Sequence, residues 1–283
     1  MARLVFNRPV VRSAAASVSG PQRLRRWAVA GGLLGVLLGA VSQAPAVWLA
    51  RAVDDATGGR LQLIEARGTL WDGSALLMLT GGPGSRDASV LPSRLDWQLS
   101  LHLDGVQLAL AQDCCVAPGL KLRLQPGWRD ATLQVQPGDA TGLLGQWPAA
   151  WLDGLGAPWN TLRPGGLLRL SSQNFQLTAG ATGWQVQGQA RVGLMQTSSR
   201  LSTLNPLGSY ELSLVGQPAA PATLQLQTLE GALQLSGSGE LRAKGGVRFR
   251  GEGRAQPGQE PALNNLLNII GRRQGATSVI TIG

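Results

Sequence analysis

Side chains that could carry out chemistry are scarce in this sequence. Its 283 residues include one histidine, His102, and two cysteines, the adjacent Cys114 and Cys115. His102 alternates with Ser100 and Asp104 in an extended run, which predicts a solvated surface histidine rather than the base of a catalytic triad. The GxxxxGK[ST], GxGxxG and GxSxG patterns, which position phosphates, dinucleotides or a nucleophilic serine, do not occur. The sequence therefore predicts a protein without enzymatic activity, metal site or cofactor.

The paired cysteines leave three states open. Adjacent side chains diverge in an extended backbone, so a disulfide between Cys114 and Cys115 needs unusual geometry. Zinc would need two further ligands, which only His102 and Asp113 could supply. A strained local disulfide, an intermolecular disulfide and two buried thiols are all compatible with the sequence. Redox catalysis is not predicted, because the spacing is not CxxC.

Period-2 alternation organises most of the chain and predicts strands. In the clearest run, Leu95, Trp97, Leu99, Leu101 and Leu103 share one face and polar residues share the other. The same pattern recurs about a dozen times between glycine and proline turns, and Gly makes up 39 residues. We expect an all-β domain whose antiparallel meander has one apolar face and forms an open or half-rolled curved sheet. The pairs Gly237/Gly239 and Gly251/Gly253 are interpreted as strand ends or bulges.

Two segments depart from the strand pattern. After Pro261, an i, i+3, i+4, i+7 stripe of Leu263, Leu266, Leu267 and Ile270 predicts a short C-terminal helix packed on the sheet. A second, weaker helical pattern covers 143–152, although it contains a proline. A terminal strand is expected over 277–282. The glycine- and proline-rich stretch 153–166 is the best internal joint of the domain, which is either one continuous sheet or two subdomains.

The N-terminal region predicts a membrane anchor. Residues 27–49 carry no charge, and as a helix the 21 residues from Trp27 to Trp48 would span about 31 Å, the thickness of a hydrocarbon core, with a tryptophan at each interface. Six arginines precede this segment: Arg3, Arg8, Arg12, Arg23, Arg25 and Arg26. By the positive-inside rule, residues 1–26 form a basic cytoplasmic segment, and residues 52–283 form a periplasmic domain. Without these arginines the net charge falls from +9 to +3, so nucleic-acid binding is not predicted.

Two alternatives concern this anchor. Ala44-Pro45-Ala46 has the form of a signal-peptide cleavage site, but the long basic segment and the apolar stretch beyond the site favour a retained anchor. Gly31, Gly35 and Gly39 lie on one helix face, which would allow close pairing of two membrane helices and hence a homo-oligomer. Glycine is also common in membrane helices, so this stripe need not have a function.

Four segments of the sequence resemble the protein N family of the bacterial type II (general) secretion pathway. They are the arginine-led anchor, Gly68-Thr69-Leu70-Trp71-Asp72-Gly73, the run Leu91-Pro92-Ser93-Arg94-Leu95-Asp96-Trp97-Gln98-Leu99, and Leu266 to Arg273 at the end of the chain. The resemblance implies a non-enzymatic accessory component in the inner membrane with a periplasmic β-rich domain. Its implied partners are the inner-membrane platform and the outer-membrane secretin. The residues carried over are structural: Gly68 and Gly73 shape turns, Trp71 and Trp97 fill the core, and Leu70, Leu95 and Leu99 complete the motif.

The alternation itself suggests a rival function. A half-rolled sheet with one apolar face makes a hydrophobic groove. Anchored periplasmic proteins of the AsmA-like kind use such grooves to move phospholipid, and this chain looks similar to them in its alternation and its anchor. Phospholipid is therefore the alternative partner.

Overall fold

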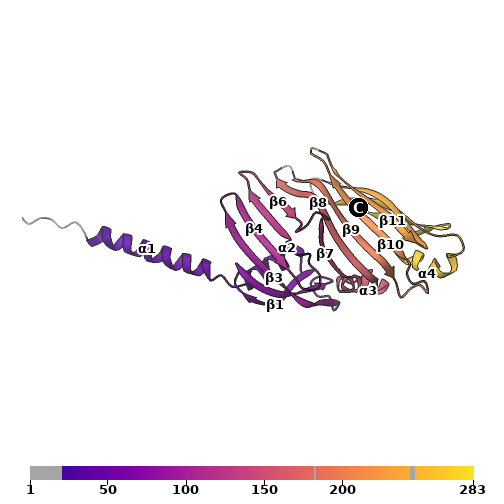
Figure 1. The fold of residues 1–283 in the computed structure, drawn as a ribbon, viewed down its shortest axis with the longest axis horizontal. Coiled ribbons are helices and arrows are strands. Elements are labelled where there is room, and N and C mark those ends of the chain that lie inside the picture. Colours follow the sequence, from indigo (N-terminus) through magenta and orange to yellow (C-terminus); the bar gives the residue numbers. More distant parts are fainter. Residues whose placement is uncertain (1–20, 182, 219, 243–245) are drawn as a thin grey trace, which may run out of the picture. The chain divides into compact units, whose positions relative to one another are not determined.

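The computed structural model describes residues 21–181, 183–218, 220–242 and 246–283. The chain divides into two compact units, the first ending at Gln43 and the second running from Ala44 to Gly283. The first contains helix α1 (Pro21–Ser42), whose early turns hold Arg23, Arg25 and Arg26 (Figure 1). The remaining arginines of the predicted basic segment, Arg3, Arg8 and Arg12, lie outside the described residues. Among the helices of the described ranges, none combines the length and the apolar character needed to cross a membrane.

The helix expected over 27–49, whose last turn Pro45 was expected to bend, is divided in two. Helix α1 ends at Ser42, and a second helix, α2 (Val47–Thr57), begins five residues later. Pro45 lacks an amide hydrogen and disfavours helical geometry in the residue before it. Residues 44–46 instead pair with a turn of the sheet: Leu70 N–H donates to Ala44 O at 2.7 Å, and Ala46 N–H donates to Gly68 O at 3.1 Å. Trp48 therefore belongs to α2 and the second unit, not to the end of a single span.

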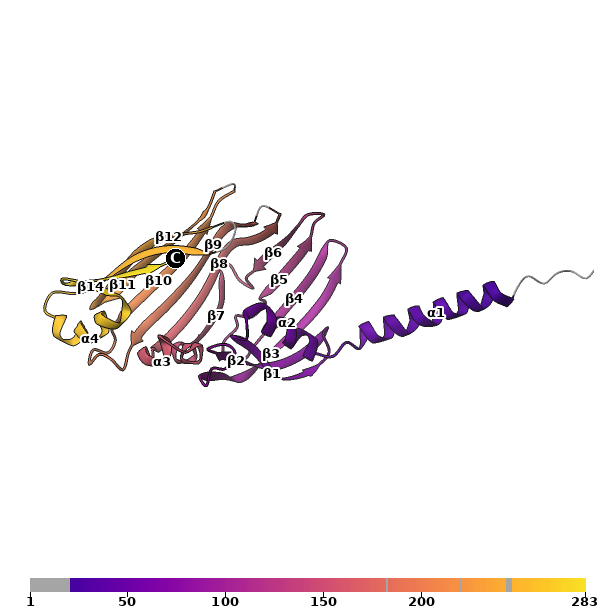
Figure 2. The same ribbon diagram turned by 180° about the vertical axis from the view of Figure 1, so that it is seen from behind.

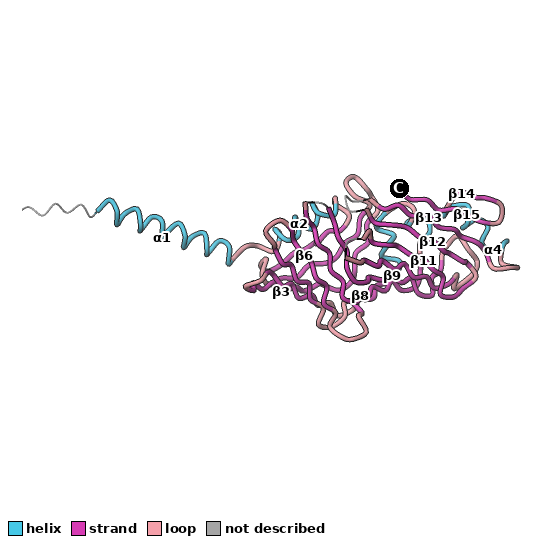
Figure 3. The backbone as a smooth tube through the Cα atoms, turned by 90° about the horizontal axis from the view of Figure 1, so that it is seen from above, coloured by secondary structure: helices cyan, strands magenta, loops and turns pink. Residues whose placement is uncertain are grey.

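Within the described residues, one 15-stranded antiparallel sheet forms the second unit, which confirms the predicted open meander. Its strands are β1 (Leu61–Gly68), β2 (Asp72–Thr80), β3 (Ala88–His102), β4 (Gly105–Ala111), β5 (Lys121–Pro126), β6 (Asp130–Gln136), β7 (Leu143–Pro148), β8 (Gly165–Gly180), β9 (Gly183–Ser198), β10 (Gly208–Gly216), β11 (Ala222–Gly231), β12 (Leu233–Leu241), β13 (Val247–Ala255), β14 (Arg272–Gln274) and β15 (Thr277–Ile282). Neighbours follow sequence order except that β7 pairs only with β8, and β15 lies between β13 and β14. Viewed from above, β8, β9 and β11 lie on one side of a curved wall, and β13, β14 and β15 lie on the other (Figure 3).

Short helices cover one end of this curved sheet. They are the 3-10 helix η1 (Ala149–Leu155), α3 (Trp159–Leu162) and α4 (Glu260–Ile270). From behind, α3 and α4 are seen at the same end of strands β7 to β11 (Figure 2). The predicted C-terminal helix is confirmed, and its Leu263, Leu266 and Leu267 are buried against Leu207 and Tyr210.

Two local predictions need correction. The segment 143–152 is not one helix, because residues 143–148 form β7, paired with Leu167–Ser171 of β8, and η1 follows Pro148. The pairs Gly237/Gly239 and Gly251/Gly253 are neither strand ends nor bulges, because β12 and β13 pair without a register shift along their length. These glycines make room for large side chains: a Cβ on Gly237 would lie 2.5 Å from Cζ of Phe249.

The stretch 153–166 contains the end of η1 and all of α3. β8 begins within it and pairs with both β6 and β9. The sheet therefore continues through the predicted joint.

Candidate functional site

One face of the sheet, called here the inner face, carries apolar side chains in continuous rows that cross the strands. Directly paired residues of neighbouring strands point to the same face. One row follows the pairings Leu99, Leu108, Leu122 and Val135 across β3 to β6. Others are Leu101, Val106, Leu124, Leu133, Leu177 and Val186 across β3 to β9, and Leu170, Val192, Leu212 and Leu226 across β8 to β11. Most of these side chains are only partly buried, so the inner face is an apolar surface that the chain itself covers incompletely.

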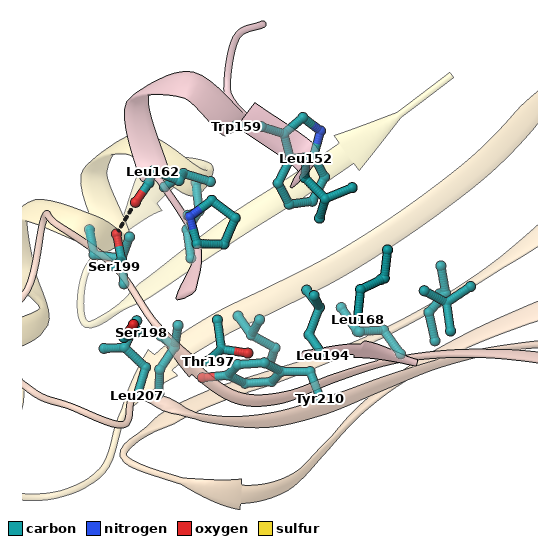
Figure 4. Close-up of a pocket in the computed structure, with 18 of the residues that line it drawn as sticks. Leu152, Trp159, Leu162, Leu168, Leu194, Thr197, Ser198, Ser199, Leu207 and Tyr210 are labelled. Atoms are coloured by element: carbon teal, nitrogen blue, oxygen red, sulfur yellow. Dashed lines mark hydrogen bonds between the residues drawn. The ribbon is translucent and has the colours of Figure 1, made fainter. Parts of the chain in front are cut away.

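Helices η1, α3 and α4 enclose part of the inner face and leave a cavity of about 400 Å³ beneath them (Figure 4). This volume lies within the range of pockets that bind small molecules. Its sheet side is formed by β8 to β12 and β15, and its cover by the three helices and the adjoining loops. The lining residues are Leu152, Trp159, Leu162, Pro164, Leu168, Val192, Leu194, Thr197, Ser198, Ser199, Leu207, Tyr210, Leu212, Leu226, Leu233, Leu235, Leu266, Ile270 and Ile280.

Two hydroxyl groups at this cavity have no hydrogen-bond partner in the described part of the chain. They belong to Tyr210, which is 5% exposed, and Thr197, which is 8% exposed. The Tyr210 ring lies along the sheet side of the cavity (Figure 4). Burial raises the pKa of the Tyr210 phenol above its ordinary value, so this group remains a hydrogen-bond donor across the physiological pH range. Both oxygens are inaccessible, so they are packed within the wall of the cavity, and the surface that faces its interior is apolar.

Hydrogen bonds hold the cover of the cavity to the β9–β10 loop. Ser199 Oγ donates to Leu162 O of α3 at 2.6 Å, and Ser202 Oγ donates to Ala262 O of α4 at 3.1 Å. The neighbouring Ser209 is fully engaged: its hydroxyl donates to Glu230 at 3.0 Å and accepts from the Gln196 N–H at 3.0 Å. Other buried polar atoms without a partner in the described residues include Asp153 Oδ1 of η1, Ser278 Oγ of β15 and Ser172 Oγ of β8.

The motif residues of β1 to β3 form a second organised cluster. Trp97 is 2% exposed, and its Nε1–H donates to Leu70 O at 3.2 Å, while Leu99 N–H donates to Trp71 O at 2.7 Å. Gly73 lies against the Trp97 ring, since a Cβ at this position would be 2.6 Å from Trp97 Cζ2. Gly68 has a φ of +85°, which favours glycine.

These contacts close the turn between β1 and β2 onto β3. Leu95 is buried in the adjacent core cluster with Leu77 and Leu91. The geometry assigns the motif a structural part in the fold.

Two adjacent hairpin tips carry strongly exposed apolar side chains. Leu103, in the β3–β4 turn, is fully exposed, and Trp128, in the β5–β6 turn, is 96% exposed. An ion pair between Arg123 of β5 and Asp104 ties the tips together, and its hydrogen bond holds the pKa of Asp104 below the ordinary range. Leu103 and Trp128 are therefore two exposed apolar side chains in turns at the same end of the sheet.

The remaining predicted residues are not among those that line the cavity. Trp27, Gly31, Gly35 and Gly39 lie in α1, with open space beside each glycine in the described residues. Trp48 is exposed on α2.

His102 is exposed at the end of β3, as predicted, 3.3 Å from Ser100 Oγ. Cys114 and Cys115 form a local disulfide, one of the three states that the sequence left open.

Sequence reasoning did not identify the cavity or its two hydroxyls. One signal was present: Tyr210 is the only tyrosine of the chain, and it stands in the apolar alternation with Leu212 and Leu214. A lone hydroxyl in a buried apolar run is unusual. The position of Thr197 could not be inferred, because the pairing of β9 with β10 that places it there contains a register shift between Gly208 and Tyr210.

The described residues place the protein in a structural class, that of open antiparallel sheets with an apolar inner face. No catalytic cluster is assembled among these residues. The family model for the type II secretion system (T2SS), protein N, matches residues 59–280. The chain belongs to this family, which supports involvement in type II secretion as an accessory component. No curated protein and no solved structure matches the chain significantly.

Proposed function

We propose that the protein is a non-enzymatic accessory component of the type II secretion system that acts through contacts with other secretion proteins. The family match over 59–280 carries this proposal. The exposed Leu103 and Trp128 support it, because neighbouring exposed apolar side chains can be buried on contact with another protein. The expected partners are the inner-membrane platform proteins and the outer-membrane secretin.

The proposed location is the inner membrane, with a cytoplasmic N-terminus and a periplasmic second unit. The arginine-rich start of the chain and the apolar sequence of α1 support this topology. The burial of Ala44 and Ala46, and their hydrogen bonds to Leu70 and Gly68, favour a retained N-terminal segment. Cleavage after Ala46 would remove these contacts from the folded domain. Pairing of α1 through Gly31, Gly35 and Gly39 is testable by comparing Gly35→Ile with the parent in a membrane association assay.

The contact proposal is tested by crosslinking in native envelopes with two tip variants, Leu103→Asp and Trp128→Asp. The matched control is Leu229→Asp. Leu229 is also exposed, at 49%, and it lies near the C-terminal end of β11, away from both turns. We expect both tip variants to lose crosslinks to platform proteins or secretin while the control keeps them. Unchanged crosslinking by the tip variants would exclude the tips as the contact site.

A second candidate function, binding of phospholipid, is favoured by the apolar rows of the inner face and by the cavity. Apolar side chains that the chain leaves partly uncovered need an apolar partner. The test is lipid analysis of the full-length protein after extraction from its own membrane and extensive washing. Stoichiometric phospholipid would support this function, and lipid-free protein would argue against it.

A further inference from the structure

We propose that the disulfide between Cys114 and Cys115 is a site of thiol–disulfide exchange with a protein that carries a dithiol, and that its reduction loosens the segment 115–117 from the edge of β7. The observation that carries this inference is the position of the disulfide. One of its cysteines is exposed, and the other begins a segment that pairs with β7. The inference does not depend on the contact function or on lipid binding.

A disulfide between adjacent residues contributes little to stability as a crosslink. The chain-entropy effect of a disulfide grows with the number of residues that it encloses, and here the two cysteines are neighbours. The bond lies within the loop between β4 and β5 and joins no distant elements. Its effect is therefore local: it fixes the conformation of the two cysteines and of the segment that follows them.

The two cysteines differ in their exposure. Cys114 is exposed, whereas Cys115 is only 9% exposed. Both lie at a surface depression of about 450 Å³ that is lined by their loop and by the start of β7. Exchange begins with direct attack of a thiolate on a disulfide sulfur, so the exposed Cys114 is the site of attack. Ser93 Oγ donates a hydrogen bond to Cys114 Sγ at 2.8 Å, which stabilises negative charge on this sulfur.

The exchange proceeds in two balanced steps. In the first, a thiolate of the partner attacks Cys114 Sγ, forms a mixed disulfide with it and expels Cys115 Sγ as a thiolate, which takes up a proton. In the second, the partner's other thiolate attacks the partner sulfur of the mixed disulfide and releases Cys114 as a thiolate, which is also protonated. The partner's two thiols become a disulfide, and their two electrons and two protons pass to Cys114 and Cys115.

The segment that follows the disulfide covers the edge of β7 opposite to β8. Gln146 N–H donates to Cys115 O at 2.7 Å, and Ala117 N–H donates to Leu144 O at 2.9 Å. Gly145 allows this close approach, because a Cβ there would lie 2.6 Å from Cys115 O. Among the described strands, β7 pairs only with β8. Opening the disulfide therefore loosens the hydrogen bonds that satisfy the second edge of β7.

Side-chain packing limits this change to the edge of β7. Val116, Trp147 of β7 and Trp151 of η1 all pack against the core cluster that contains Leu95. The rings of the two tryptophans are 6.3 Å apart. None of these contacts involves a cysteine sulfur, so we expect reduction to loosen the hydrogen bonds without unfolding the domain.

The first experiment locates the attack, with the full-length protein in detergent and thioredoxin as the dithiol probe. A thioredoxin variant whose second active-site cysteine is replaced by serine retains the mixed disulfide of the first step. N-ethylmaleimide then caps the remaining thiol, and mass spectrometry locates both groups. We expect thioredoxin on Cys114 and the cap on Cys115. Absence of a mixed disulfide, or thioredoxin mainly on Cys115, would overturn the exchange site.

Amide hydrogen exchange tests the coupling to β7. After reduction by excess wild-type thioredoxin, we expect the amides of Gln146 and Ala117 to exchange about tenfold faster, because their hydrogen bonds open more often. Amides of β12 and β13, which lie near the other end of the strand order, should keep their rates. Equal rates at Gln146 and Ala117 before and after reduction would overturn the loosening of the segment.

Two variants separate the disulfide from other effects of thioredoxin. The double variant Cys114→Ser/Cys115→Ser should show fast exchange at both amides with and without thioredoxin. Asp113→Ser changes an exposed residue of the same loop and keeps both cysteines, so it should respond to thioredoxin as the parent does. A response to thioredoxin in the double variant would show that the disulfide is not the cause and would overturn the proposal.

Discussion

Tyr210→Phe is predicted to stabilise the lipid-free protein, an unusual outcome for a substitution in the core. The Tyr210 side chain packs with Leu207, Leu233 and the buried leucines of α4, and its hydroxyl has no partner among the residues that the structure describes. Phenylalanine keeps the ring contacts and removes only the oxygen. If the hydroxyl were paired within the protein, its removal would instead destabilise the fold by about 1 kcal/mol.

The magnitude follows from the desolvation of the hydroxyl. A buried hydroxyl without a partner costs about 1–3 kcal/mol, so its removal should raise the free energy of unfolding by at least about 1 kcal/mol. For a domain of this size, each kcal/mol shifts Tm by about 2–4 °C. The predicted outcome is a higher Tm for Tyr210→Phe than for the parent protein.

The assay is urea unfolding of delipidated full-length protein, followed by tryptophan fluorescence, with Thr281→Val as the control. A decrease in the free energy of unfolding for Tyr210→Phe would refute the orphan-hydroxyl reasoning, because it would show that the hydroxyl already has a stabilising partner. An increase would show that the hydroxyl is buried without a stabilising partner.

Three further predictions concern pH dependence, core packing and the disulfide. Burial raises the pKa of Tyr210, so the unfolded chain releases the phenol proton near pH 10 while the folded chain keeps it. The free energy of unfolding should therefore fall above about pH 10, by up to about 1.4 kcal/mol per pH unit. Tyr210→Phe should lack this loss when urea unfolding is measured across the same pH range. Gly73→Ala should lower the free energy of unfolding by about 1–3 kcal/mol, because its Cβ would overlap Trp97. The control is Gly180→Ala, whose Cβ would make only ordinary van der Waals contacts. Equal effects of the two substitutions in urea unfolding would contradict this packing argument. Iodoacetamide should label neither Cys114 nor Cys115 until a reductant is added, as measured by intact mass; labelling without reductant would contradict the local disulfide.

Local periodicity predicted most of the sheet because each strand carries its own evidence. The alternation of Leu95, Trp97 and Leu99 determines which face is buried, and any register that buried the other face would expose all three. The stripe of Leu263, Leu266 and Leu267 similarly predicted α4 together with the face that it buries. These features depend on residues that lie close to one another in the sequence.

The features that sequence reasoning did not find depend on distant partners. The break between α1 and α2 is stabilised by hydrogen bonds from residues 44–46 to the turn at Gly68–Leu70. The pairing of β7 with β8 is likewise not encoded in the helix-like pattern of 143–152. The cavity requires η1, α3 and α4 to meet the same part of the sheet, and no local pattern specifies that meeting. The disulfide could not be derived because the spacing of two adjacent cysteines fits several states.

Crosslinking in native envelopes, followed by affinity purification of the full-length protein and mass spectrometry, tests the central claim most directly. The account predicts recovery of secretion-platform proteins or secretin, lost in Leu103→Asp and Trp128→Asp and kept in Leu229→Asp. Recovery of phospholipid without any secretion protein would contradict the contact function and leave lipid binding as the function of this domain.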